Sequence, residues 1–138
     1  MQIRKIMQTD VATLQHDEPL IDAVETTASE RIRHIPVLEG SRLVGIISAT
    51  DIKHATPSPL LEGNQADYRK ILHGTPVSRI MRRSPITASP DDSLGTVVRL
   101  MVDNKIGAIL IVEGEQLVGI VSELDILRTY LQVLEVIE

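Results

Sequence analysis

Two short motifs in the sequence each place a hydroxyl and a carboxylate close together, and such groups can hold a small polar molecule. Ser48 and Asp51 form the first motif, and Ser122 and Asp125 form the second. Each follows a short apolar run rich in β-branched residues, which predicts a buried strand. The Ser-x-x-Asp spacing then predicts a helix start, where backbone N–H groups have no partner within the helix. The sequence therefore indicates two candidate small-molecule sites.

The same four residues also fit a purely structural role. In a capping box the serine accepts a bond from the helix backbone, and the acidic residue turns back to the N–H group of the serine. Both interpretations stay open at this point.

Composition and motif content exclude several classes of function. The 138 residues carry a net charge of −5, which disfavours a nucleic-acid binder, and aromatic residues make up only 1%. There is no cysteine, and His16, His54 and His73 do not stand at metal-ligand spacing, so we expect no metal site. No run is long enough to span a bilayer or to form a signal peptide. We expect a cytoplasmic protein without membrane or nucleic-acid partners.

Catalytic machinery is missing from the sequence. No nucleophile stands beside a base, and no glycine-rich phosphate loop of the G-x-x-x-x-G-K-[ST] kind is present. We therefore expect that the protein is not an enzyme. The rival interpretation, a nucleotide-processing enzyme with Asp51 or Asp125 as base, has no second catalytic group to support it.

The elements that position these motifs occur twice. When Met7 is placed on Met81, residues 6–53 align with residues 80–127 without a gap, and roughly a third of the paired positions are identical. We assign residues 1–56 to the first repeat, 57–76 to a connector and 77–138 to the second repeat.

Each repeat is expected to fold in the order β-α-β-β-α, so the fold class is α/β (α+β). A glycine between the second and third strands indicates a hairpin. In the first repeat we expect strands at 11–13, 34–38 and 42–47 and the first helix at 19–31. In the second repeat we expect strands at 86–88, 108–112 and 116–121 and the first helix at 93–105. The second helix of each repeat is expected to start at Ser48 or Ser122.

In and around the connector, the sequence predicts a loop over residues 55–65 and a short helix over residues 66–72. Residues 124–137 are predicted to form a helix whose apolar face is broader than one small repeat can bury. That face either covers the partner repeat or forms a subunit interface, and we expect a homodimer through the helices.

The duplicated unit, with LVGIISATDI and LVGIVSELDI at its ends and IRHIPVLEG and IGAILIVEG before them, resembles the tandem CBS-domain pair, or Bateman module. More narrowly, DIKHATPS and DILRTYLQ resemble the CBS part of acetoin-utilisation (AcuB-type) proteins. The resemblance implies two repeats packed about a pseudo-two-fold axis, with clefts between them that bind AMP, ATP or S-adenosylmethionine.

The resemblance also implies roles for individual residues. Asp51 and Asp125 would bind the ribose, and Ser48, Thr50 and Ser122 would add hydroxyl groups. The residues that would flank the adenine are Val11, Ala12, Pro85 and Ile86. Ile46 and Ile120 would form apolar walls of the clefts, and Arg33 and His34 would contact a phosphate group.

These residue types suit an adenosyl ligand. One carboxylate can accept bonds from both ribose hydroxyls, and a guanidinium can bind a phosphate with two parallel bonds. The second repeat has Gly107 and Ala108 where the first has Arg33 and His34, and Leu124 where the first has Thr50. The two sites should therefore differ in affinity or ligand.

The sequence thus predicts a regulatory sensor module that binds an adenine nucleotide or a related adenosyl compound. The alternative is a ligand-independent dimerisation scaffold that works through its final apolar helix. Two smaller interpretations also stay open. Arg33 and His34 could be polar residues at a strand edge, and Arg82 and Arg83 could be solvated surface or could rim the entry for a phosphate group.

Overall fold

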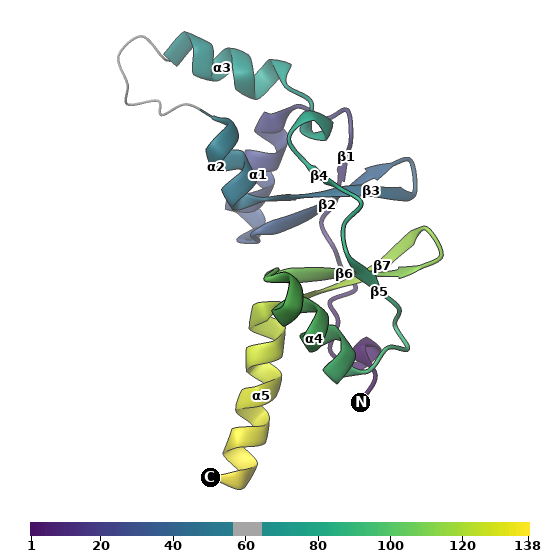
Figure 1. Cartoon of the computed structure of the whole chain (residues 1–138). Coiled ribbons are helices and arrows are strands. Elements are labelled where there is room, and N and C mark those ends of the chain that lie inside the picture. Colours follow the sequence, from purple (N-terminus) through teal and green to yellow (C-terminus); the bar gives the residue numbers. More distant parts are fainter. Residues whose placement is uncertain (57–64) are drawn as a thin grey trace. The chain divides into compact units, whose positions relative to one another are not determined.

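The structure is a computed structural model that describes residues 1–56 and 65–138 (Figure 1). Its contacts divide the chain into two compact units. The first-repeat unit is Ala12–Pro85, and the second-repeat unit combines Met1–Val11 with Ile86–Glu138. Each unit therefore includes the first residues of the other sequence repeat. The domain boundaries predicted from the duplication describe the repeats, and they stay a prediction.

The first-repeat unit has a small mixed sheet covered by helices. Strand β1 runs parallel to β2, and β2 pairs antiparallel with β3, which pairs antiparallel with the short β4. The elements are β1 (Leu14–Gln15), α1 (Leu20–Glu30), β2 (His34–Glu39), β3 (Arg42–Ser48), α2 (Ala49–Ala55), α3 (Gln65–Gly74), the 3₁₀ turn η2 (Val77–Arg79) and β4 (Arg82–Arg83).

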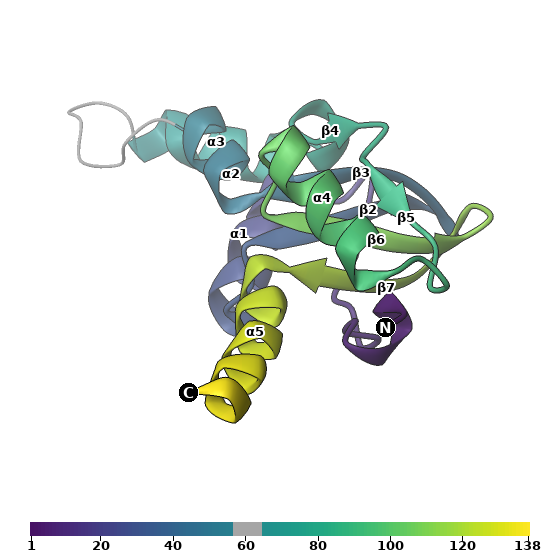
Figure 2. The ribbon, with the colours of Figure 1, turned by 60° about the horizontal axis from the view of Figure 1, so that its bottom comes forward.

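The second-repeat unit repeats this plan. Strand β5 runs parallel to β6, β6 pairs antiparallel with β7, and Gln8 bridges to Ile120 of β7. Its helix α4 packs on β6, as Figure 2 shows. The elements are the 3₁₀ turn η1 (Ile3–Lys5), β5 (Thr87–Ala88), α4 (Leu94–Asn104), β6 (Ala108–Glu113), β7 (Gln116–Ser122) and α5 (Glu123–Ile137).

The hairpins form where the sequence predicts them. Glu39 pairs with Arg42 and Glu113 pairs with Gln116, so each turn has two residues. The first turn residue is Gly40 or Gly114, each with a φ of +63°. Glycine adopts this conformation without steric cost, and its place at the start of a two-residue turn matches the twist of the flanking strands.

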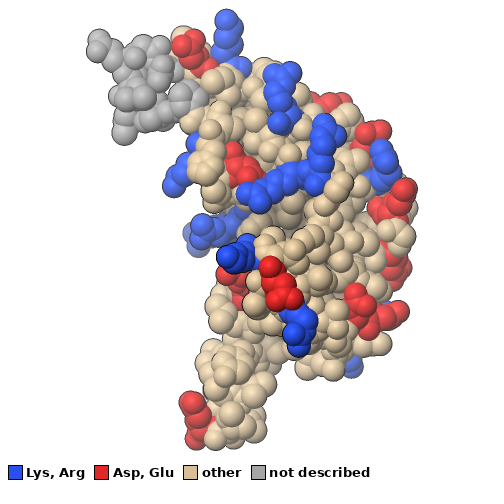
Figure 3. Space-filling view, viewed as in Figure 1, with Lys and Arg blue, Asp and Glu red and all other residues tan. Residues whose placement is uncertain are grey.

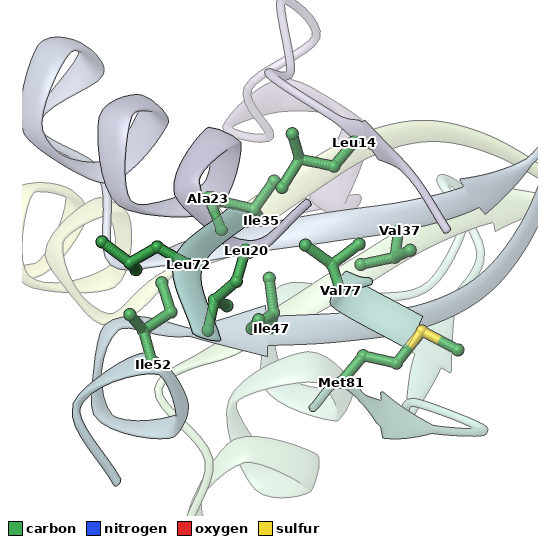
Figure 4. Packing of buried hydrophobic residues seen from close by; sticks show 10 residues of the cluster. All are labelled: Leu14, Leu20, Ala23, Ile35, Val37, Ile47, Ile52, Leu72, Val77 and Met81. Carbon is green, nitrogen blue, oxygen red and sulfur yellow. The ribbon is translucent and has the colours of Figure 1, made fainter. Parts of the chain in front are cut away.

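Each unit has its own hydrophobic core. In the first-repeat unit the core draws side chains from the sheet, from all three helices and from the segment around η2 (Figure 4). It consists of Leu14, Leu20, Ala23, Ile35, Val37, Ile47, Ile52, Leu72, Val77 and Met81. The second-repeat unit has a matching core of Ile3, Ala88, Val97, Met101, Ile109, Ile111 and Val121.

The predicted order β-α-β-β-α is confirmed in both repeats. The first strand was placed wrongly: residues 11–13 make no ladder, and β1 begins at Leu14, which pairs with Val37 and is 4% exposed. The prediction followed the β-branched residues, but burial against β2 decides which residues pair. The short helix of the connector is confirmed as α3, whereas most of the predicted loop falls on residues 57–64, outside the described residues.

The turns η1 and η2 and the strand β4 were not predicted. Within the described ranges, no helix combines the length and the hydropathy needed to cross a membrane.

Candidate functional site

The first Ser-x-x-Asp motif forms a complete capping box at the start of α2. Ser48 accepts a bond from the N–H group of Asp51 at 3.0 Å, and Asp51 Oδ2 accepts a bond from the N–H group of Ser48 at 2.9 Å. The carboxylate is thereby held in one orientation at the end of β3. The structural interpretation of this motif is confirmed.

The second motif has the same geometry at the start of α5. Asp125 Oδ2 accepts bonds from the N–H group of Ser122 at 2.8 Å and from its hydroxyl group at 3.0 Å. Asp125 is 7% exposed and belongs to a helix of 15 residues. Asp51 and Asp125, which occupy equivalent positions in the two repeats, thus both use Oδ2 for the capping box.

The other carboxylate oxygen accepts a bond from a residue that the sequence analysis did not assign to the site. Arg82 Nε lies 3.3 Å from Asp51 Oδ1, and Gln8 Nε2 lies 2.9 Å from Asp125 Oδ1. Gln8 and Arg82 each follow an Ile-Met pair, so the alignment of the repeats already places them at equivalent positions. That equivalence was the available signal. The Arg82 side chain is 70% exposed, as its interpretation as solvated surface predicts, but that interpretation did not include the ion pair with Asp51.

Backbone pairing brings these two side chains to the carboxylates. Arg82 pairs with Ile46 of β3, while Gln8 and Ile120 of β7 exchange two backbone bonds of 2.9 and 3.0 Å. Ile46 and Ile120, which the resemblance assigns as apolar walls, are half-buried beside this pairing. The strand neighbour of each predicted wall residue therefore reaches the predicted ribose-binding carboxylate.

The basic pair of the first repeat lies at the same end of its sheet. His34 pairs with Ser48 across β2 and β3, and the carbonyl group of Arg33 accepts a bond from the N–H group of Ala49 at 2.9 Å. Arg33 and Thr50 have exposed side chains. The structure thus gathers Arg33, His34, Ser48, Thr50 and Asp51 around one strand end.

The adenine-flanking candidates lie on the segments that lead into each repeat. Val11 and Ala12 are half-buried and precede β1, and the unit boundary falls between them. Pro85 is half-buried and ends the first-repeat unit, whereas Ile86 is 36% exposed and begins the second part of the second-repeat unit. Within residues 1–56 and 65–138, none of these four residues is hydrogen-bonded to the side chain of Asp51 or Asp125.

The two carboxylate sites differ in charge. Asp51 has a cationic partner whose side chain is 70% exposed, whereas Asp125 has a neutral amide partner. In the second-repeat unit, Gly107 takes the place of Arg33, with its carbonyl group bonded to the N–H group of Glu123 at 2.9 Å. The backbone framework is the same in both units, and only the side chains change.

The arrangement can accept hydrogen bonds. Each carboxylate oxygen has two lone pairs, and each Oδ1 makes one side-chain bond in the structure, so it retains acceptor capacity. Among the residues that the structure describes, no group of three or more His, Asp or Glu side chains could hold a metal ion. The sites therefore offer fixed acceptors for a ligand with neighbouring hydroxyl groups.

Comparison with known families finds the CBS domain twice. The family model matches residues 3–58 and again residues 77–132. Both matches end beyond the start of the helix that carries the aspartate, so each includes one Ser-x-x-Asp motif.

Individual relatives agree with this result. Protein MJ1225 of Methanocaldococcus jannaschii is 33% identical over 123 residues, which cover 88% of this chain and 44% of the relative. Its crystal structure matches with a TM-score of 0.81 and 32% identity, over 94% of this chain and 47% of that one. The chain thus spans less than half the length of this relative.

Two further solved structures match over nearly their whole length. The CBS domain pair of protein MJ0100, in complex with 5′-methylthioadenosine and S-adenosyl-L-methionine, has a TM-score of 0.77 and 26% identity, and the match covers 94% of this chain and 95% of that one. A protein of Vibrio cholerae assigned provisionally to acetoin utilisation (AcuB) has a TM-score of 0.79 and 25% identity, with 98% and 93% covered.

Proposed function

The chain belongs to the CBS-domain family, with two copies of the domain in tandem, and from this premise we propose that it is a regulatory module that binds an adenosyl compound through Asp51 and Asp125. One observation supports this proposal above the others. In both units the cap occupies Oδ2 of the aspartate, while Oδ1 accepts a side-chain bond from an exposed residue, Arg82 or Gln8.

A ribose could bind to this oxygen without breaking the cap. Its two neighbouring hydroxyl groups would donate to Oδ1, and the side chain of Arg82 or Gln8 would move aside or bind another part of the ligand. The capping box keeps the carboxylate oriented before the ligand arrives, which lowers the entropic cost of binding. Structural and ligand-binding roles are thus compatible in the same residue.

The ligand class follows from the family and from the local charges. The CBS pair of MJ0100 was crystallised with two adenosyl compounds. In the first-repeat unit, Arg33 and Arg82 would attract a phosphate group, so AMP or ATP suits Asp51. In the second-repeat unit, Gln8 carries no charge, so S-adenosylmethionine or methylthioadenosine suits Asp125.

Binding would regulate and not catalyse. Arg82 belongs to the second sequence repeat but packs in the first-repeat unit, and Gln8 belongs to the first sequence repeat but packs in the second-repeat unit. A ligand that replaces their bonds to Asp51 and Asp125 would remove one side-chain bond that holds the segment around Arg82 or Gln8 to its unit. A partner protein would respond to that local change.

Isothermal titration with AMP, ATP, S-adenosylmethionine and methylthioadenosine tests the proposal. We expect Asp51→Ala to weaken AMP and ATP binding, and Asp125→Ala to weaken binding of the uncharged or cationic compounds, each by about tenfold or more, since bonds to a charged group contribute roughly 1.5–3 kcal/mol.

Asp92→Ala is the matched control. The Oδ2 atom of Asp92 also accepts a bond from a backbone N–H group three residues earlier, that of Ser89 at 2.9 Å, but outside both motifs. This variant should lose the same kind of local bond and retain wild-type affinity. Absence of binding heat for all four compounds up to millimolar concentration would refute the proposal.

A ligand-independent dimerisation scaffold is the second candidate function. The exposed apolar side chains on α5 favour it. Sedimentation with and without each compound separates the two candidates, because a scaffold would form the same assembly in the absence of ligand and bind none of the four.

A further inference from the structure

Arg82 and Gln8 offer an incoming ligand different chemistry, although each donates to Oδ1 of the aspartate in its own unit. Arg82 Nε lies 3.3 Å from Asp51 Oδ1 in an ion pair. Gln8 Nε2 lies 2.9 Å from Asp125 Oδ1, and its amide is neutral. A ribose that binds to Oδ1 competes with one of these donors. The cost of displacing the donor, and the partner that the donor finds afterwards, therefore differ between the two sites.

The backbone that carries Arg82 is fixed, whereas its side chain is free to turn. Met81 lies in the core of the first-repeat unit, and β4 pairs with Ile46 and Gly45 of β3. The Arg82 side chain is 70% exposed, and that of Asp51 is 13% exposed. The guanidinium can thus leave Asp51 by side-chain rotation alone, while the carboxylate keeps its capping bond to the backbone.

The ion pair uses only a small part of the guanidinium. Its contact with Asp51 is made through Nε, and in the described ranges of the chain Arg82 has no second ion pair. A guanidinium has five N–H groups in a planar fork, so the four on the two Nη atoms are not used by Asp51. Two parallel N–H groups of such a fork match two oxygens of a phosphate. A phosphate is therefore a better partner for Arg82 than the single carboxylate oxygen that it contacts in the structure.

The charge of each unit favours the same distinction. The first-repeat unit contains nine Lys or Arg and nine Asp or Glu residues, whereas the second-repeat unit contains five and ten. The net charge of −5 thus lies entirely in the second-repeat unit. Figure 3 shows Lys and Arg side chains spread over the upper part of the view, which is the first-repeat unit. An anionic ligand is repelled by the net charge of the second-repeat unit only.

We propose that Arg82 makes the Asp51 site selective for ligands with a phosphate group, and that it does so by changing partners. Arg82 competes with a ribose for Asp51 Oδ1. A nucleotide compensates for the lost ion pair, because its phosphate becomes the new partner of the guanidinium. A nucleoside without a phosphate displaces Arg82 into water and gains no bond in return.

The Asp125 site has no such requirement, because displacing the neutral amide of Gln8 breaks no ion pair. Uncharged and cationic adenosyl compounds therefore bind there. This inference rests on the proposed binding of adenosyl compounds at Asp51 and Asp125, and it adds the residue that selects between them.

NMR titration of the isotope-labelled whole chain with AMP and with adenosine tests the selection at each site separately. The N–H groups of Ser48 and Ser122 donate to Asp51 and Asp125, so their signals report the two sites. By the Ser48 signal, wild-type protein should bind AMP at least about tenfold more tightly than adenosine, because of the added bonds between charged groups. By the Ser122 signal, it should show no such preference.

Exchange of the two donors should exchange the preference. Arg82→Gln should weaken AMP binding at the Ser48 signal by about tenfold, because the phosphate loses its charged partner. The same variant should strengthen adenosine binding there by up to about fivefold, because the ion pair no longer competes. Gln8→Arg should strengthen AMP binding at the Ser122 signal and weaken binding of S-adenosylmethionine, whose sulfonium group a guanidinium repels.

Arg83→Gln is the matched control. Arg83 is the next residue of β4, is exposed and pairs with Gly45. Successive side chains of a strand point to opposite faces, and among the described residues Arg83 forms no ion pair. This variant removes the same charge from the same strand and should leave the ratio of the AMP and adenosine affinities unchanged. Thermal unfolding verifies that each variant is folded.

Salt provides a second test that needs no variant. Because the Arg82 side chain is largely exposed, added salt screens its attraction to Asp51. When NaCl is raised from about 0.05 M to about 0.5 M, adenosine should bind about twofold more tightly by the Ser48 signal, and AMP should bind more weakly. Adenosine binding by the Ser122 signal should not change.

The outcomes separate this inference from the proposed function. If Arg82→Gln keeps the wild-type ratio of AMP to adenosine affinity, Arg82 does not select the ligand, and this inference is overturned while the proposed function stands. Equal binding of AMP and adenosine at the Ser48 signal of the wild type has the same consequence. If no compound shifts either signal up to millimolar concentration, the proposed function and this inference are overturned together.

Discussion

Gly45 and Gly119 lie where a methionine and a backbone carbonyl group approach the strand too closely for a side chain. A Cβ atom on Gly45 would lie 2.5 Å from the sulfur of Met81 and 2.9 Å from the carbonyl oxygen of Arg82. One on Gly119 would lie 2.8 Å from the sulfur of Met7 and 3.0 Å from the carbonyl oxygen of Gln8. Glycine thus permits the pairing that brings Arg82 and Gln8 to the aspartates.

Alanine at either position should destabilise the protein. We expect Gly45→Ala and Gly119→Ala to lower the free energy of unfolding by about 1–3 kcal/mol, because the backbone carbonyl cannot move without breaking the strand pairing. Urea denaturation followed by circular dichroism measures the change.

Gly95 provides the matched control. It lies near the start of α4, where the nearest atom to an added Cβ is the Ser93 hydroxyl oxygen at 4.0 Å. Gly95→Ala should be neutral or raise stability by up to about 1 kcal/mol, since alanine favours a helix over glycine. If Gly45→Ala were as stable as Gly95→Ala, the close approach would not constrain the strand.

At the scale of elements, helices α1 and α4 end on residues that are unusual for their conformation. Arg31 and Lys105 follow the two helices with φ values of 55° and 53°, in the left-handed region. A residue with a Cβ atom pays a steric cost there of roughly 1–2 kcal/mol, and glycine does not. Both repeats keep this strain at the same position.

Glycine at these two positions should therefore stabilise the chain. We expect Arg31→Gly and Lys105→Gly each to raise the free energy of unfolding by a few tenths to about 1 kcal/mol, after the entropic cost of glycine in the unfolded state. Differential scanning calorimetry measures the change in melting temperature.

Glu30→Gly tests whether the position or the residue type matters. Glu30 is exposed and is the last residue of α1, immediately before Arg31. Its replacement should lower stability by about 1 kcal/mol, because glycine weakens a helix from within. Equal effects at positions 30 and 31 would contradict the assigned helix end.

At the scale of the whole molecule, the compact units cross the boundaries of the sequence repeats. The core of the first-repeat unit includes Leu72, Val77 and Met81, which lie beyond residues 1–56. The core of the second-repeat unit includes Ile3, which lies before residues 77–138. Neither repeat alone contains a full core.

Fragments cut along the two kinds of boundary should behave differently. We expect residues 12–85 to fold and to unfold cooperatively in urea, because this fragment holds every residue of its core cluster. Residues 1–56 lack three of the ten residues of that cluster and should remain unfolded. Far-UV circular dichroism and amide exchange compare the two, and a folded 1–56 fragment would contradict this account of the core.

The order of elements, the hairpin turns and the two Ser-x-x-Asp helix starts could be predicted from the sequence alone. These features depend on local patterns, namely apolar periodicity, a glycine between two strands and a cap residue followed by an acid. The ungapped repetition of the patterns then indicated the CBS family, which the family model confirms.

The partners of the two carboxylates were decided only by tertiary structure. Gln8 and Asp125 are separated by 117 residues and Arg82 and Asp51 by 31, and no local pattern links residues so far apart. The start of β1 was decided in the same way, because the fit of Leu14 against Val37 overrode the β-branched residues before it. Sequence patterns report the conformation of neighbouring residues, whereas these contacts exist only because distant segments share one core.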